Sequence, residues 1–389
     1  MKKLWDKNIS VRTSVHEFTA GKDRVLDERL APFDVLGSMA HTAMLNKVNI
    51  INEEEYNSLK AGLNSIFTNI SEGKFKINPE VEDVHSQVEI LLTEMLGQTG
   101  KKIHSGRSRN DQVLVDLKMY FREEINYLAE SLLSLFNSLI IQGEKHKANL
   151  MPGYTHCQVA MPSSFGLWFG AYAEALTDEI SNLLAAYRLI NQNPLGSAAG
   201  YGSSFPLDRS MTTYLLGFRE PVVNVVYAQM GRGRTERALG NSIASLASTF
   251  SQMAMDLVLF NSQNFGFVTL PDEYTTGSSI MPHKKNPDVF ELIRGKCNKL
   301  SQVPQQLSAI TNNLPTGYHR DVQELKEVIF NAIDEIKACT DMLNEAIPLL
   351  QVKENILEDK KYDLLFSVEV VNEKVLSGVP FRDAYRHVA

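Results

Sequence analysis

The segment Gly277–Pro287 concentrates side chains that could do acid–base chemistry. It contains two adjacent serines, a histidine, two lysines and an asparagine. It has no helical or strand period of apolar residues and is broken by prolines, which predicts a loop. A helical pattern starts at Asp288, and cations and amide donors ahead of a helix N-terminus favour the binding of an anion. These residues alone also allow a basic surface loop without a ligand.

A second polar segment, residues 101–112, contains two arginines on either side of Ser108. Arg107 and Arg109 could bind a carboxylate through paired hydrogen bonds. Asn110 and Asp111 follow at the start of a long helical pattern, where such residues cap a helix. The segment therefore predicts either a carboxylate site at a helix start or a capped helix with two surface arginines.

Two further polar groups lie in a predicted turn and at a predicted helix start. Thr155, His156 and Gln158 follow a Pro-Gly pair in a short connection. A lone histidine in a turn is more often structural or solvated than catalytic. Asp83 and His85 lie at the opening of a helical pattern, where they either line a site or form a solvated first turn.

The elements that must position these groups are predicted to be helical. In the first hundred residues we expect short helices, one of them starting at Asn52 ahead of three glutamates. Five long helical patterns follow, which predicts an all-α protein built around an extended helical bundle. These patterns cover residues 110–143, 162–190, 235–261, 287–312 and 321–346.

The third long pattern is small or apolar on nearly every face between Asn241 and Phe250. Such a helix is usually buried on all sides, from which we infer burial by other subunits and a homo-oligomer. The first long helix should span ~50 Å. If the second helix packs antiparallel to it, Asn110 and His156 lie at opposite ends of one subunit. They could then share a site only by coming from different chains.

The composition excludes several classes of function. The chain has 389 residues, 43% of them hydrophobic and 22% charged, and a net charge of −7, so it has no general attraction to nucleic acid. Three widely spaced cysteines form neither a disulfide framework nor a metal-ligand pattern and are typical of a reducing cytoplasm. Residues 1–6 are not followed by an apolar signal core, and no stretch is expected to reach membrane-spanning length.

The motifs together resemble a known family. The Gly-Ser-Ser-x-Met-Pro-x-Lys-x-Asn-Pro loop at residues 277–287 is similar to the signature of the fumarase/aspartase superfamily, whose members release fumarate. Gly-Tyr-Thr-His-x-Gln at residues 153–158 and Pro-Leu-Gly-Ser at 194–197 resemble other segments of that superfamily. His-Ser-Gly-Arg-Ser-Arg-Asn-Asp-Gln at 104–112 and Tyr-x-x-Asp-x-Gln-x-x-Lys at 318–326 resemble the argininosuccinate lyase branch.

The resemblance covers essentially the whole chain and implies a fold, an assembly and a reaction. The fold would be a long central bundle at residues 110–350, between a helical domain at 1–109 and a smaller one at 351–389 that is expected to be truncated. The assembly would be a cytoplasmic homotetramer whose active sites combine segments from three subunits. The reaction would be the anti elimination of L-argininosuccinate to fumarate and L-arginine, without a metal or organic cofactor.

The resemblance also implies roles for single residues. Ser278 would act as the base in alkoxide form, and His156 would protonate the departing nitrogen. Which of these two groups acts as base and which as acid stays open. Glu291 would orient the histidine. The substrate would be bound by Ser108, Arg109, Asn110, Thr155, Lys284, Asn286, Tyr318, Gln323 and Lys326.

One departure from the family pattern and two alternative functions remain. The family commonly has a serine near its N-terminus that contacts substrate. Residues 18–27 lack it, so either Lys22 or Arg24 substitutes for it or the loop is rearranged, and no such site is carried over. The same loop signature occurs in adenylosuccinate lyases, although the segment 104–112 argues against that branch. A non-catalytic, crystallin-like structural protein is the alternative from a different class.

Overall fold

The computed structural model of the protein describes residues 12–389, so the expectation placed on residues 1–6 lies outside the described residues. The chain divides into two compact units. The first contains the described part of Met1–Tyr127 together with Asn182–Ala244 and Gln302–Asp334. The second contains Leu128–Ser181, Ser245–Ser301 and Glu335–Ala389. The three-domain division expected from the sequence stays a prediction.

The first unit opens with short helices, as predicted. Asn52 accepts a hydrogen bond from the backbone of Glu55, whose side chain in turn accepts from the backbone of Asn52, so a capping box starts α4. Asp83 caps α5 in a similar way, by accepting from the backbone of Ser86. The helices in order are α1 (Thr13–Ala20), α2 (Asp23–Asp27), α3 (Ala31–Lys47), α4 (Glu53–Ser71), α5 (Val84–Leu96) and α6 (Gln98–Lys101).

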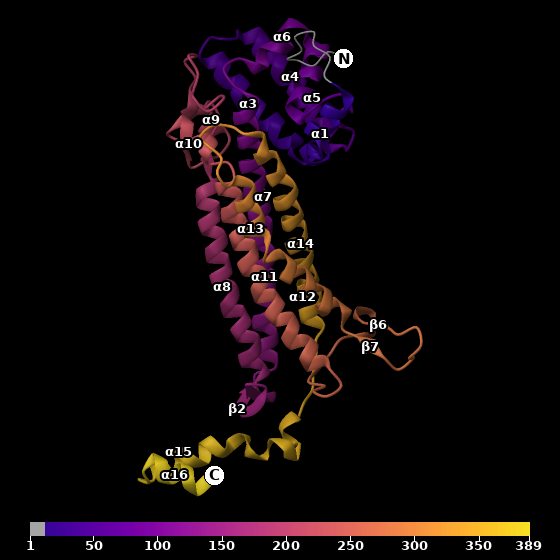
Figure 1. Cartoon of the computed structure of the whole chain (residues 1–389), viewed down its shortest axis with the longest axis vertical. Helices are drawn as coiled ribbons and strands as arrows, with labels where there is room; N and C mark the ends of the chain where they lie inside the picture. Colours follow the sequence, from indigo (N-terminus) through magenta and orange to yellow (C-terminus); the bar gives the residue numbers. More distant parts are fainter. Residues whose placement is uncertain (1–11) are drawn as a thin grey trace. The chain divides into compact units, whose positions relative to one another are not determined.

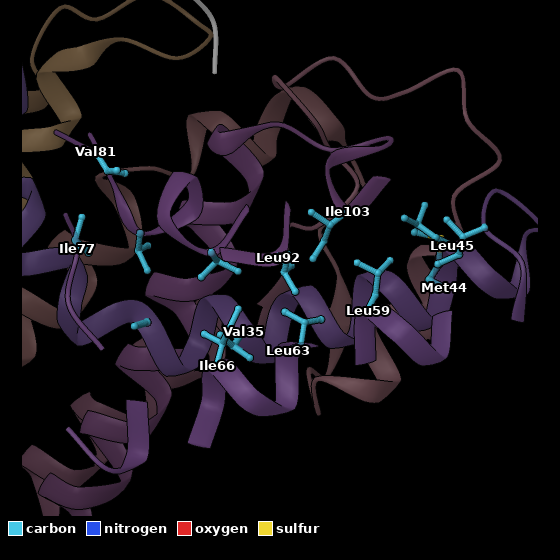
Figure 2. Packing of buried hydrophobic residues seen from close by; sticks show 14 residues of the cluster. Val35, Met44, Leu45, Leu59, Leu63, Ile66, Ile77, Val81, Leu92 and Ile103 are labelled. Carbon is cyan, nitrogen blue, oxygen red and sulfur yellow. The ribbon is translucent and has the colours of Figure 1, made fainter. Parts of the chain in front are cut away.

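The apolar faces of α3, α4 and α5 form one hydrophobic core (Figures 1 and 2). Leu59 and Leu63 of α4 point toward Leu92 of α5 and are fully buried (Figure 2). Gly62 permits this close approach, because a Cβ atom there would lie 2.8 Å from a methyl group of Leu92. Burial of this apolar surface stabilises α5 and thereby fixes the position of the polar residues at its start.

The remainder of the first unit brings distant segments of the chain together. Two short strands, β3 (Gln192–Asn193) and β4 (Glu220–Pro221), pair in parallel. Asn193 donates to the hydroxyls of Thr212 and Thr213, both at 3.0 Å, and so holds α9 against β3. The other elements include α9 (Arg209–Leu215), α10 (Val225–Met230), α13 (Val303–Thr311) and a 3₁₀ helix, η4 (Arg320–Glu324).

The second unit contains segments of the long helices. Asp256 of α11 accepts hydrogen bonds from Trp168, at 3.0 Å, and Tyr172, at 2.8 Å, both on α8. Glu179 of α8 accepts a hydrogen bond from Ser245 of α11 at 3.1 Å, which is a second contact between these two helices. The long helices are α7 (Arg109–Lys145), α8 (Phe165–Ile190), α11 (Arg234–Asn261), α12 (Asp288–Leu300) and α14 (Leu325–Ala346).

Three short antiparallel strand pairs also belong to the second unit. The longest is the hairpin of β1 (Leu150–Thr155) and β2 (Gln158–Ser164). The others pair β5 (Val268–Thr269) with β8 (Gln351–Val352), and β6 (Thr276–Gly277) with β7 (Lys285–Asn286). The unit ends in α15 (Ser367–Leu376) and α16 (Phe381–Val388).

Most of the predicted helices are present, and the all-α class is confirmed, but three boundaries were wrong. The fifth pattern, predicted from residue 321, begins with η4 (Arg320–Glu324), and α14 starts only at Leu325. The fourth pattern, predicted as one helix over 287–312, is two helices that break at Ser301–Gln302. Pro304 lies in the first turn of α13, where a missing amide is tolerated, but it could not continue α12. The second pattern starts at Phe165 instead of residue 162, because residues 158–164 pair as β2.

The segment Val225–Asn261 corrects the expectation that no stretch is apolar and long enough to cross a membrane. An 18-residue window within it has a mean hydropathy of 1.4, and 44% of that window is buried inside the protein. Leu246 and Phe250 are buried, whereas Asn241 and Ser248 are exposed. A core helix of a soluble protein has the same length and composition, so this feature is weak evidence for a membrane span.

Candidate active site

A pocket of about 180 Å³ lies within the first unit. Its wall is formed by α2, the start of α5 and the residues before it, the start of α7, the residues before α11, η4 with the residues before it, and the start of α14. Several residues predicted to bind substrate converge on it, namely Arg109, Asn110, Tyr318, Gln323 and Lys326. The other lining residues are Asp23, Asp27, Glu82, Asp83, His85, Val113, Arg232 and Arg320.

Acidic residues at the start of α5 hold Arg109 in place. One guanidinium nitrogen of Arg109 lies 3.1 Å from Asp83 and 3.4 Å from Glu82. Ser108 accepts a hydrogen bond from the backbone of Asn110 at 3.3 Å, and the Ser108 backbone donates to Asp111 at 2.8 Å. The cap of α7 is therefore Ser108, and Asp111, in the first turn, returns a hydrogen bond to the Ser108 backbone. The two residues predicted as caps, Asn110 and Asp111, lie within the helix, and Asn110 lines the pocket.

The Asp111 carboxylate also attaches the Pro-Leu-Gly-Ser segment to the start of α7. It accepts hydrogen bonds from the backbone amides of Gly196 and Ala198, both at 2.9 Å. Gly196 has a φ of +87°, a conformation that glycine adopts without steric cost. The irregular backbone predicted here is thus held against the helix that carries Asn110.

Lys326 is buried at the back of the pocket between two carboxylates. Its ammonium lies 2.6 Å from Asp27 and 2.7 Å from Asp23, and the residue is 3% exposed. Burial lowers the pKa of Lys326, but the charges of Asp27 and Asp23 outweigh it and raise the pKa above its ordinary value. Sequence reasoning missed both aspartates, although their i, i+4 spacing places them on one face of a helix.

His85 lines the pocket and is anchored from behind. Its Nδ1 atom lies 2.6 Å from Asp34 and 3.5 Å from Asp116, and all three residues are buried, so the expectation of a solvated first turn was wrong for His85. Burial lowers the pKa of His85, but the charge and hydrogen bond of Asp34, together with the charges of Asp83 and Asp27, outweigh it, and the net shift is upward. Burial, followed by the charge of Asp34, raises the pKa of Asp116 well above its ordinary value.

The buried side chains of His85, Asp34 and Asp116 are spaced for a hydrogen bond and not for coordination of a metal ion. The three ligand atoms lie within 4.8 Å of one another. Two ligands of one tetrahedral zinc ion stand about 3.3 Å apart, given bond lengths near 2.0–2.1 Å. The 2.6 Å separation of His85 and Asp34 is shorter and is that of a charge-assisted hydrogen bond. No metal role is therefore assigned to these residues.

His156 lies at the tip of the β1–β2 hairpin in the second unit. Thr155 pairs with Gln158, so the loop consists of His156 and Cys157, with φ values of +54° and +57°. Positive φ at both central residues is typical of a type I′ turn, which usually requires glycine or asparagine. The short connection predicted from the sequence is thus a strained hairpin that exposes the His156 imidazole.

The predicted signature loop connects β6 and β7. The hydroxyl oxygen of Ser278 accepts hydrogen bonds from the backbone amides of Met281, at 3.1 Å, and Ile280, at 3.4 Å. Asn286 lies in β7 and donates to Thr276 at 3.5 Å. Lys284 is exposed. The loop therefore directs two amide donors at one serine oxygen, an arrangement that favours negative charge on that oxygen.

The structure of a single chain does not bring together all of the predicted catalytic residues. Glu291 lies on α12, is exposed, and has Arg294 at 4.0 Å as its ionic neighbour. Within residues 12–389 no hydrogen bond joins Glu291 to His156. The pocket of the first unit contains neither Ser278 nor His156.

Comparison with known proteins identifies the family. A family model described as lyase matches residues 10–301. An argininosuccinate lyase of Parabacteroides distasonis is 59% identical over 386 residues, which are 99% of this chain and 86% of that protein. One from Thermotoga neapolitana is 37% identical, with coverage of 100% and 97%.

The chain belongs to the argininosuccinate lyase family. The resemblance seen in the motifs is thereby confirmed, and the family is one of lyase enzymes. Solved structures share the fold. An EDDS lyase in complex with formate superposes with a TM-score of 0.79 at 24% identity, covering 98% of this chain and 76% of that one. A class II fumarase from Schistosoma mansoni gives 0.75 at 15% identity, with coverage of 98% and 93%.

Replacement of Lys326 tests the buried charge arrangement. Lys326→Met would leave Asp23 and Asp27 facing each other without a cation, and the free energy of unfolding should fall by about 3–5 kcal/mol. Lys22→Met is the matched control, since the exposed pair of Lys22 with Glu327 should contribute at most about 1 kcal/mol. Urea unfolding of both variants measures this. Equal losses of unfolding free energy in the two variants would contradict the assignment of Lys326 as a buried cation that pairs with Asp23 and Asp27.

The raised pKa of His85 predicts a pH-dependent contribution to stability. Folding favours protonated His85, so its contribution is complete below the unfolded pKa of 6.5 and is lost as the pH rises through the higher folded value. We expect His85→Gln to lower the free energy of unfolding more at pH 6 than at pH 9. Chemical denaturation at both pH values provides the measurement. A loss of unfolding free energy that is larger at pH 9 than at pH 6 would show that folding does not raise the pKa of His85.

Proposed function

We propose that the chain catalyses the anti elimination of L-argininosuccinate to fumarate and L-arginine. The observation that carries the proposal is the convergence of Arg109, Asn110, Tyr318, Gln323 and Lys326 on one pocket in a member of this family. The pocket holds both cations and carboxylates, which suits a substrate that carries a guanidinium, an ammonium and three carboxylates.

The difficult step is removal of the weakly acidic proton beside a carboxylate. It yields a dianion whose charge must be stabilised by donors that are already in place. We assign the base to Ser278, whose oxygen already accepts the amides of Ile280 and Met281. Lys284 and Asn286, from the same loop, would stabilise the dianion, and closure of the loop would exclude water.

The departing nitrogen needs a proton, which we assign to His156 on the β1–β2 hairpin. Glu291 would accept from the imidazole and orient it, following the logic of a hydrolase triad. Thr155, beside the histidine, and Asn110, with Ser108, would hold the succinyl carboxylates. The assignment of base and acid between Ser278 and His156 is part of the proposal.

We further propose that the site is completed by other copies of the chain in a homotetramer. Asn110 lies in the first turn of α7, and the hairpin with His156 follows the last turn of this 37-residue helix. A helix of that length spans about 55 Å. Exposed apolar side chains on α7 and α8, including Leu133, Ile141 and Leu167, offer surface for an interface between copies.

The remaining parts of the proposal concern the cellular setting. All three cysteines, Cys157, Cys297 and Cys339, are free, which is in keeping with a reducing cytoplasm. We propose a cytoplasmic enzyme that acts on a small molecule, without a nucleic-acid or membrane partner and without a cofactor.

Two substitutions test the chemistry. Ser278→Ala removes the base and His156→Asn removes the acid, so each should reduce turnover of argininosuccinate at least a thousandfold while leaving the oligomer intact. Formation of fumarate is followed by ultraviolet absorbance, and the native mass by light scattering. The matched controls are Ser377→Ala and His387→Asn, both exposed near the C-terminal helices, which should retain full activity.

The substrate used in the assay separates the competing functions. Near-normal activity of Ser278→Ala or His156→Asn would refute the assigned roles. Fumarate produced from adenylosuccinate but not from argininosuccinate would place the chain in the neighbouring branch. Fumarate from neither substrate would favour a structural, crystallin-like role.

A further inference from the structure

We infer that Glu82 is an internal competitor for a substrate carboxylate. Its side chain pairs with the guanidinium groups of Arg320 and Arg109, and a ligand carboxylate that binds there displaces it. Arg320 thereby becomes a further substrate-binding residue. The inference rests on the proposed function, because it concerns the same pocket and the same polycarboxylate substrate.

Glu82 contacts both arginines, and all three residues line the pocket. One of its oxygens lies 2.6 Å from Arg320, on η4, and the other lies 3.4 Å from Arg109, on α7. The two oxygens therefore bridge cations from elements more than 200 residues apart in the sequence. A ligand carboxylate in the same place could make the same two charge-assisted contacts.

Of the two neighbouring acids, Asp83 also serves as a helix cap. Asp83 caps α5 through bonds from the backbone of Ser86, at 2.8 Å, and from the Ser86 hydroxyl, at 2.6 Å. It is therefore committed to the helix end while it contacts Arg109. Glu82 precedes this cap and has a longer side chain. Rotation of its side chain can release the arginines without unwinding α5.

Arg320 is held in position by contacts that do not involve Glu82. Its Nε donates to Gln323 at 3.1 Å, and a terminal nitrogen donates to the backbone oxygen of Thr19 at 2.8 Å. The guanidinium would therefore remain in place after Glu82 moves away. A donor fixed in advance costs a ligand less ordering entropy than a mobile one.

The charge state of Glu82 suits an exchange of one carboxylate for another. Burial raises the pKa of Glu82, but the hydrogen bond and charge of Arg320, together with the charge of Arg109, outweigh it, and the net shift is downward. Glu82 is thus ionised near neutral pH and compensates the arginines when no ligand is present. A ligand carboxylate can take its place at little net cost in charge, whereas a neutral amide cannot.

Binding of succinate, a minimal dicarboxylate, tests the exchange by calorimetry on the full chain at constant ionic strength. Glu82→Gln removes the competing charge and should tighten succinate binding about three- to tenfold, the range expected from loss of one charge-assisted contact. Glu80→Gln, an exposed acid two residues away, is the control and should leave the affinity unchanged. Succinamide, which has no charge, should bind the Glu82→Gln variant no more tightly than it binds the parent protein.

A double variant shows whether the effect passes through Arg320. The Arg320→Gln variant should bind succinate more weakly than the parent protein. Adding Glu82→Gln to this variant should raise its affinity for succinate much less than Glu82→Gln raises that of the parent. Glu82→Asp keeps the charge but shortens its reach, and a smaller gain is expected. Unchanged or weaker succinate binding by both Glu82 variants, with thermal midpoints near that of the parent, would overturn the inference. Binding is measured without turnover, so a failure of the proposed reaction would be seen separately.

Discussion

The pocket depends on one buried cation. The ammonium of Lys326 lies out of water, where an unpaired charge would cost several kcal/mol, so its position requires both Asp23 and Asp27. These contacts attach α2, near the start of the chain, to α14, which begins 300 residues later. Residues from segments that lie between these two helices in the sequence line the same pocket as Asp23, Asp27 and Lys326. The position of the first helices is thus set by charge pairing as well as by apolar packing.

The rest of the pocket extends the same principle. His85 is held from behind by Asp34, and Arg109 is held from the side by Asp83 and Glu82. Lys326, His85, Arg109 and Arg320 all have acidic partners, and Glu82 is shared by the two arginines, so the pocket can keep several charges in a partly buried space. Such compensation also keeps the donors in fixed positions, which is the condition for stabilising a charge that develops during a reaction.

The local patterns of the sequence were sufficient for most of the helices and for the family. The apolar period predicted α7 and α11 to within two residues at their observed ends, because long amphipathic patterns are decided locally. The β1–β2 hairpin could not be predicted in this way. Its turn consists of His156 and Cys157 in a left-handed conformation that neither residue favours, so the pairing of the strands must impose it.

The pairing of distant charges was equally hidden from the sequence. Nothing near Lys326 indicates that its partners lie in α2, and the spacing of Asp23 and Asp27 shows only that they share a helix face. Five of the nine residues that the motifs predict to bind substrate line the pocket, and their role stays a prediction. The predicted pairing of Glu291 with His156 does not occur between the described residues of one chain.

The central claim is that one active site is assembled from different copies of the chain. It is tested most directly by mixing two inactive variants, Asn110→Ala and His156→Asn, each with a different affinity tag, and isolating hybrid oligomers that carry both tags. The account predicts that each variant alone produces no fumarate and that the hybrids regain a measurable fraction of wild-type activity, because some of their sites contain neither substitution. Hybrids that form and remain inactive would contradict it, since all site residues would then come from a single chain.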